Sequence, residues 1–226
     1  MMARFRFCSC ILGVSLGISA HLAAGANLAL LFPGWEVTYL KKGLIGKHAL
    51  RGTGLWGSGL IVLFASVLIT LTGWRRGCFS NSGHCKSMLI SLLAGFLAFW
   101  GAFACFVTSG VALKDGPFCM FAVPSSNETQ ALKYGYPFKG LNDRNYLYDH
   151  FFWDSVCIEP PRAVIWHVIF FSTLLGISVI QILLVLAQLI NSLLGFFCGF
   201  FEKREVISLL GASVAKWTLA SSRIHS

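Results

Sequence analysis

Charged residues are scarce in this sequence. They make up 12% of its 226 residues, whereas roughly a quarter of an ordinary soluble domain is charged. Hydrophobic residues account for 56%, and they gather in uninterrupted runs of about 20 or more, which is the length that crosses a bilayer. The composition therefore excludes a cytosolic enzyme and a disordered chain.

The sequence also has no cluster of basic residues. The net charge is +9, but no stretch concentrates five or six Lys and Arg as a nucleic-acid-binding patch does, so we expect no nucleic-acid partner. The excess is better explained by membrane topology. Eight cysteines are too few for a disulfide scaffold and enough for one bridge.

Motifs for catalysis and for cofactors are missing. There is no phosphate-binding Gly-rich loop, metal-ligand set, dinucleotide fingerprint or nucleophile elbow. Asp149, His150 and Ser155 supply the residue types of a hydrolytic triad, but a solvated loop explains them more simply. We therefore expect no catalytic residues, no cofactor, no metal and no enzyme.

The hydrophobic runs predict four transmembrane helices. The first is too long for a cleaved signal peptide and is better explained as a signal anchor. The last stays apolar to Phe201, which exceeds one bilayer, so we expect a bend at Asn191 or Gly195. The predicted order is a cytosolic N-terminus (1–10), helix 11–32, a short extracellular loop (33–53), helix 54–74, a cytosolic turn (75–87), helix 88–113, a large extracellular loop (114–163), helix 164–190, and a juxtamembrane segment with cytosolic tail (191–226).

The orientation follows from chemical markers in the large loop. Nine Lys and Arg fall on each side of the membrane, so the positive-inside rule decides nothing. Asn127 begins an Asn-Glu-Thr glycosylation acceptor, and Cys119 and Cys157 bracket the same loop, as an oxidising compartment permits. A Cys119–Cys157 bridge would close about 38 residues and stabilise the loop by about 4 kcal/mol. The fold class is thus an all-α membrane protein, a four-transmembrane-helix bundle with a small disulfide-closed extracellular loop.

Aromatic residues of the large loop form a candidate partner surface. Rings in alternating positions favour order over disorder, because they supply apolar area to bury. The loop either displays these rings to a partner or packs them into a cap over the helix ends; both interpretations stay open. The candidate surface consists of Tyr134, Tyr136, Phe138, Tyr146, Tyr148 and Trp153.

Five cysteines lie next to the predicted membrane boundaries on the cytosolic side. Such thiols are candidates for S-palmitoylation, although they would also serve as small unmodified hydrophobes. Cys105 lies inside the third span and is expected in the core. The candidate acylation sites are Cys8, Cys10, Cys78, Cys85 and Cys198.

Polar residues of the fourth span recur on one helical face. His167, Gln181 and Gln188 lie at multiples of seven residues, and Asn191 follows three residues later. Lipid cannot satisfy an amide, so we expect these side chains to hydrogen-bond across helices. No charged residue lies in the middle of any span, which favours helix adhesion over an ion path. Small residues at 94, 98 and 102 predict close helix approach, as do the glycines at 54, 57 and 59. Trp100 lies deep in the third span, so we expect its side chain to be packed inside the bundle.

Several short strings along the chain resemble a known family. They are Gly116-Pro117-Phe118-Cys119, Tyr146-Leu147-Tyr148-Asp149 with Trp153, Cys157-Ile158-Glu159-Pro160, and Gln188-Leu189-Ile190-Asn191 with Cys198-Gly199-Phe200. Together they are similar to the L6 branch of four-span membrane proteins, which is distantly similar to tetraspanins. The Cys-Cys-Gly triplet of true tetraspanins is absent from the sequence.

The resemblance implies a non-enzymatic multi-pass adaptor. Such a protein gathers receptors, integrins or other four-span proteins into lateral assemblies that affect adhesion, motility or fusion, in the plasma membrane or in endosomal or lysosomal membranes. Its partners would be membrane lipid and other membrane proteins, and self-association stays open. The alternative is an accessory regulatory subunit of a channel or proton pump that uses the amides of the fourth span.

Overall fold

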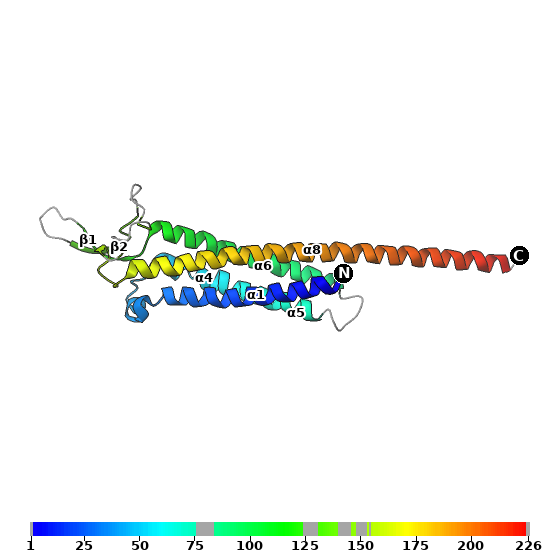
Figure 1. Ribbon diagram of the computed structural model, residues 1–226, viewed down its shortest axis with the longest axis horizontal. Coiled ribbons are helices and arrows are strands. Elements are labelled where there is room, and N and C mark those ends of the chain that lie inside the picture. The colour runs from blue at the N-terminus through cyan, green and yellow to red at the C-terminus, as the bar shows by residue number, and fades with distance from the viewer. Residues whose placement is uncertain are drawn as a thin grey trace.

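The computed structural model describes the backbone of residues 2–75, 84–123, 131–139, 146–147, 153 and 155–224, and the side chains of residues 7–74, 88–123, 131–139, 146–147, 153 and 155–197. Within these residues, four helical segments are long and apolar enough to cross a membrane: Phe7–Leu30, Lys47–Trp74, Met88–Asp115 and Ala163–Phe197. They lie side by side in one bundle (Figure 1). The expected fold class, a mostly helical four-span membrane protein, is confirmed.

The second span is assembled from several short helices, whereas the other three are single long helices. A two-stranded antiparallel sheet lies beyond one end of the bundle (Figure 1), and it adds a feature that the sequence analysis did not predict. The elements are α1 (Met2–Leu30), η1 (Pro33–Trp35), α2 (Thr38–Lys41), α3 (Lys47–Leu50), α4 (Thr53–Leu55), η2 (Trp56–Ile61), α5 (Val62–Arg75), α6 (His84–Asp115), β1 (Cys119–Val123), β2 (Ala131–Gly135) and α8 (Ala163–Ile224).

Small side chains line the middle of the bundle. Ala94, Ala98 and Ala102 of α6 are fully buried, and they pack in one cluster with Leu16 of α1 and Val185 of α8. Helices in lipid gain little from burying apolar surface, so their association depends on close packing. The alanine row permits that approach, and the larger Leu, Ile and Phe side chains cover the outside of the bundle.

The glycines of the second span allow two backbones to touch. A Cβ atom added at Gly101 of α6 would lie 2.5 Å from the Gly57 carbonyl oxygen, and one added at Gly57 would lie 2.8 Å from the Gly101 carbonyl oxygen. Gly57 belongs to η2, which is a π-helical turn. The close approach that the glycines predict is therefore confirmed at this crossing.

The fourth span continues without interruption. The expected bend at Asn191 or Gly195 is wrong, because α8 is one helix of 62 residues that extends far beyond the bundle (Figure 1). No proline follows Pro161 to break the helix. Asn191 donates to Ser9 Oγ at 2.9 Å, and Gly195 faces Met88 of α6. These contacts hold the straight helix against α1 and α6.

Trp100 is not packed as expected. It is 65% exposed and lies edge-on to the ring of Phe103 on the outer side of α6. The cause is the alanine row. A helix that turns Ala98 and Ala102 inward must point Trp100, which is midway between them, outward.

Candidate functional site

The part of the chain beyond one end of the bundle carries the two-stranded sheet and most of the aromatic residues of the predicted partner surface. We call the described parts of residues 31–53 and 116–162 the lobe. At its base, side-chain donors from α8 and from the lobe bond to carbonyls in the last turns of α1 and α6. These bonds are Trp166 Nε1 to the Ala29 carbonyl (3.0 Å), His167 Nε2 to the Ala112 carbonyl (2.9 Å) and the Tyr146 hydroxyl to the Leu113 carbonyl (2.5 Å).

A disulfide closes the large loop as the sequence predicts. It joins Cys119, the first residue of β1, to Cys157, with 5.6 Å between their Cα atoms. Next to it, Met120 exchanges two backbone hydrogen bonds with the segment that follows Val156, at 2.8 and 2.9 Å. The bridge therefore ties β1 to the chain that leads into α8.

Two of the predicted surface rings instead form the core of the lobe. Phe138 and Tyr146 are buried and stack with their centroids 4.5 Å apart, and Trp153 Nε1 donates to the Tyr146 carbonyl at 2.9 Å. Burial also raises the pKa of the Tyr146 phenol. The prediction that Phe138 and Tyr146 present a partner surface is thus wrong, because a small loop needs its largest rings to build a core.

Tyr134 and Tyr136 are half-buried, and each bonds to a neighbouring segment. The Tyr134 hydroxyl donates to Glu159 Oε2 at 3.1 Å, and the Tyr136 oxygen accepts from the backbone N–H of Lys47 at 2.9 Å. Burial raises the pKa of both phenols. Tyr134 therefore links β2 to the chain before α8, and Tyr136, which follows β2, links the loop to α3. Tyr148, the remaining ring of the predicted surface, lies outside the described residues.

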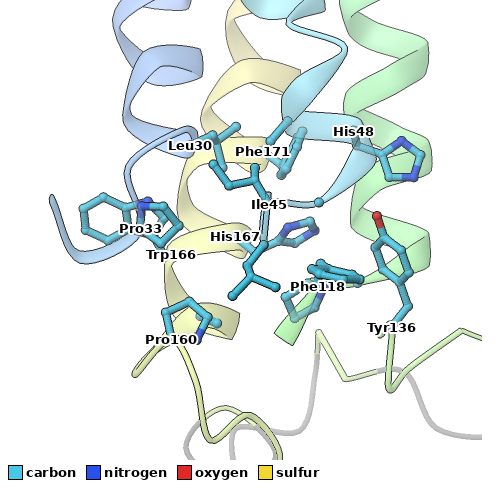
Figure 2. Close-up of a pocket in the computed structure, with 16 residues that line it drawn as sticks. Leu30, Pro33, Ile45, His48, Phe118, Tyr136, Pro160, Trp166, His167 and Phe171 are labelled. Atoms are coloured by element: carbon cyan, nitrogen blue, oxygen red, sulfur yellow. The ribbon is translucent and has the colours of Figure 1, made fainter. Parts of the chain in front are cut away.

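A hydrogen bond between His48 and Asp115 at the base of the lobe was not predicted. His48 Nε2 lies 2.9 Å from Asp115 Oδ2, which joins α3 to the end of α6. In Figure 2 the phenol of Tyr136 points toward the His48 imidazole, and their ring centroids are 6.4 Å apart. The two partners are 67 positions apart in the sequence, so no spacing or motif could reveal the pair.

A small cavity lies beside this pair (Figure 2). Its volume is about 40 Å³, far below the several hundred Å³ of a site for a cofactor. Among the described residues, no three His, Cys, Asp or Glu side chains come together as metal ligands. The walls of the cavity include Leu30, Ile45, His48, Phe118, Tyr136, Trp166, His167 and Phe171.

The amide of Gln181 joins three elements in the middle of the bundle. Its Oε1 accepts from Ser58 Oγ at 2.5 Å, and its Nε2 donates to the Ser58 carbonyl at 3.0 Å and to Ser19 Oγ at 3.3 Å. Ser58 belongs to η2 and Ser19 to α1. Gln181 is 0% exposed, so this α8 side chain is saturated by hydrogen bonds inside the protein.

A second polar cluster lies two helical turns further along α8. Gln188 is buried, and its Nε2 lies 3.0 Å from both Ser9 Oγ and Ser91 Oγ and 3.1 Å from Ser192 Oγ. Asn191 Nδ2 donates to the same Ser9 hydroxyl. Three helices, α1, α6 and α8, thus meet at one group of hydroxyls and amides. His167 lies at the other end of this face, in the lobe base.

The candidate modification sites are only partly described. Cys8 is exposed and Cys10 is half-buried, whereas Cys105 is buried in the core. Cys85 lies in α6 and Cys198 in α8, but the structure describes no side chain for either. Cys78 and Asn127 lie outside the described residues.

Known proteins match nearly the whole chain. The L6 membrane protein family matches residues 3–202. Human transmembrane 4 L6 family member 19 is 65% identical over 201 residues, which cover 89% of this chain and 96% of the relative. Mouse member 4 is 36% identical over 85% of this chain and 91% of its own length, and human member 1 is 34% identical over 85% and 93%. No solved structure matches the chain. With four membrane-spanning helices and this similarity along its length, the chain belongs to the L6 membrane protein family.

Proposed function

We propose that this multi-pass membrane protein is a non-enzymatic adaptor that organises other membrane proteins into lateral assemblies. The observation that carries the proposal is the use of the intramembrane amides. Gln181 and Gln188 bond to serines of neighbouring helices, so they hold the bundle together. The exposed surfaces, which are the lobe and the outer faces of the helices, then remain for contacts with partners.

The packing between the two amides supports adhesion over conduction. Val185 lies between Gln181 and Gln188 on α8, and it is fully buried together with Leu16 of α1. An ion that crossed the bundle would have to pass this apolar layer without any charged residue in the middle of a span. An adaptor needs no such path.

The rigid base of the lobe supports a role in recognition. The Tyr146–Leu113 hydrogen bond and the His48–Asp115 contact join the lobe to the end of α6, and the disulfide ties β1 to the chain that leads into α8. A surface held in one conformation loses little entropy when it binds. The family resemblance suggests receptors, integrins or other four-span proteins as the partners, in the plasma membrane or in endosomal or lysosomal membranes.

Two modifications belong to this proposal. A glycan on Asn127 would mark the lobe side as extracellular, and acyl chains on Cys8 and Cys10 would add lipid contacts at the opposite end of the bundle. Glycosidase treatment tests the first and acyl exchange the second. A Cys8→Ser, Cys10→Ser double variant that keeps the full acyl signal would reject acylation at these two thiols.

Crosslinking in intact cells followed by mass spectrometry tests the adaptor role. We expect a varied set of membrane receptors and four-span proteins around the full-length chain. One stoichiometric complex with a channel or pump would reject the adaptor and support the accessory-subunit alternative. An unrelated four-span protein expressed at the same level is the control for random proximity.

A further inference from the structure

Among the described residues, β2 is the outer strand of the lobe and pairs with one neighbour, β1. β1 lies between β2 and the short segment at Ile158 and Glu159, because Met120 N–H donates to the Glu159 carbonyl and Ile158 N–H donates to the Met120 carbonyl. Within the described residues, no backbone group on the other side of β2 binds it. The hairpin projects beyond the helix ends (Figure 1).

The register identifies which backbone groups of β2 point away from β1. The N–H and C=O of Met120 point away from β2, so Met120 and Tyr134, which lie opposite each other, form a non-hydrogen-bonded pair. Pairs alternate along an antiparallel ladder, so Lys133 exchanges hydrogen bonds with Phe121. The N–H and C=O groups of Leu132 and Tyr134 therefore point outward, away from β1.

The side chains along this edge are accessible. Leu132 is 58% exposed, and Ala131 and Lys133 are exposed as well. Leu132 and Tyr134 lie on one face of the hairpin and Lys133 lies on the other, because successive side chains of a strand alternate. A free strand edge with outward backbone donors and acceptors is a template for another strand.

We infer that this edge binds an extended segment from the outer domain of a partner membrane protein, which adds to the hairpin as a third strand beside β2. The segment carries an acidic residue opposite Lys133 and apolar residues opposite Leu132 and Tyr134. Backbone hydrogen bonds supply the attraction, and the opposite charge across from Lys133 selects the sequence. The inference rests on the proposed function and names the chemistry of its partner.

A second copy of the chain fits this edge less well. In a two-fold pair, β2 of one copy would lie antiparallel to β2 of the other. The register in which the outward backbone groups of both Leu132 and Tyr134 are bonded places Lys133 opposite Lys133 of the second copy. Like charges directly opposite each other destabilise a strand pair, and lysine on an edge is a common means of preventing self-association. The charge on this edge therefore favours a different, acidic segment.

Peptide binding to the full-length chain in lipid nanodiscs tests the inference. The probe is the fluorescent peptide Thr-Thr-Val-Glu-Val-Thr-Thr, and its controls are the same peptide with Lys in place of Glu and a version N-methylated on both Val residues. We expect the Glu peptide to bind at least tenfold more tightly than either control. Equal binding of all three, or no binding of the Glu peptide, overturns the inference.

Variants of β2 assign the binding to the edge. Leu132→Pro removes an outward N–H and leaves the bonds to β1 intact, so it should lower the affinity for the Glu peptide at least tenfold. Leu132→Thr keeps the N–H and should retain most of that affinity. Lys133→Glu should reverse the preference toward the Lys peptide. An unchanged affinity of Leu132→Pro, or an unchanged preference of Lys133→Glu, contradicts the inference. An intact Cys119–Cys157 bridge on non-reducing gels verifies the fold of each variant.

Crosslinking of the same variants in cells separates this inference from the proposed function. If the wild-type chain has protein neighbours and Leu132→Pro loses a subset of them that Leu132→Thr keeps, both stand. If the neighbours of Leu132→Pro are unchanged, the edge is rejected and the adaptor role survives. A crosslink between the β2 strands of two copies would show self-pairing and reject the partner segment.

Discussion

Replacing Gln181 with leucine tests whether the buried amide stabilises the bundle. The substitution preserves most of the volume and removes three hydrogen bonds, which join α8 to Ser58 and Ser19. Hydrogen bonds between membrane helices contribute about 0.6 kcal/mol each, so we expect the free energy of unfolding to fall by about 2 kcal/mol. That corresponds to a decrease of roughly 30-fold in the ratio of folded to unfolded protein.

Reversible unfolding in mixed micelles with increasing SDS measures this loss. Ser178→Ala is the matched control, because Ser178 is also buried on α8 and, among the described residues, its hydroxyl bonds to the Leu174 carbonyl of its own helix and to no other helix. We expect the control to change the free energy by less than about 1 kcal/mol. If Gln181→Leu unfolds within about 0.5 kcal/mol of the wild type, the amide does not hold the bundle together. Ion flux through purified protein in liposomes that Gln181→Leu abolishes would refute the adhesive role outright.

Three further perturbations probe other parts of the structure. Cys157→Ser opens the bridge across 38 positions and should reduce the stability of the lobe by about 4 kcal/mol, seen as faster proteolysis of the lobe while the spans stay protected. Gly101→Ala forces a Cβ against the Gly57 carbonyl and should cost about 1–3 kcal/mol in SDS unfolding, whereas Gly176→Ala, whose added Cβ meets nothing within 4 Å, should leave stability unchanged or higher. Because burial raises the pKa of Tyr146 from its ordinary 10.0, its contribution to lobe stability is fully present below pH 10 and is lost as the pH rises further; Tyr146→Phe should flatten that part of the pH profile.

The membrane-spanning architecture could be predicted because it depends on local composition. Runs of apolar residues identify helices in lipid whatever their neighbours are, since each helix satisfies its own backbone. The Cys119–Cys157 bridge could be predicted too, because both cysteines bracket the long loop that also contains the Asn-Glu-Thr acceptor sequence at Asn127. The exposure of Trp100 was also within reach, since the alanines on either side of it already identify the inward face of α6.

Other features depend on contacts between distant parts of the chain. The His48–Asp115 pair and the capping of α1 and α6 by Trp166 and His167 appear only when the helix ends are brought together. The π-helical turn η2 has no residue signature beyond its glycines, because a shift in backbone hydrogen bonding leaves the composition unchanged. The alternating tyrosines indicated order, but the partner strand of β2 could not be identified from them.

The uninterrupted course of α8 has a mechanical consequence. Its 62 residues form a rod of about 93 Å at 1.5 Å per residue. Near its start, Trp166 and His167 are hydrogen-bonded to the ends of α1 and α6. Gly195 still faces Met88 of α6, so about 29 residues, or about 44 Å of helix, follow that contact, and a tilt of about 5° there displaces the far tip by about 4 Å. A small change in packing at the end of the bundle is thereby enlarged along the rod, without any unwinding of the helix.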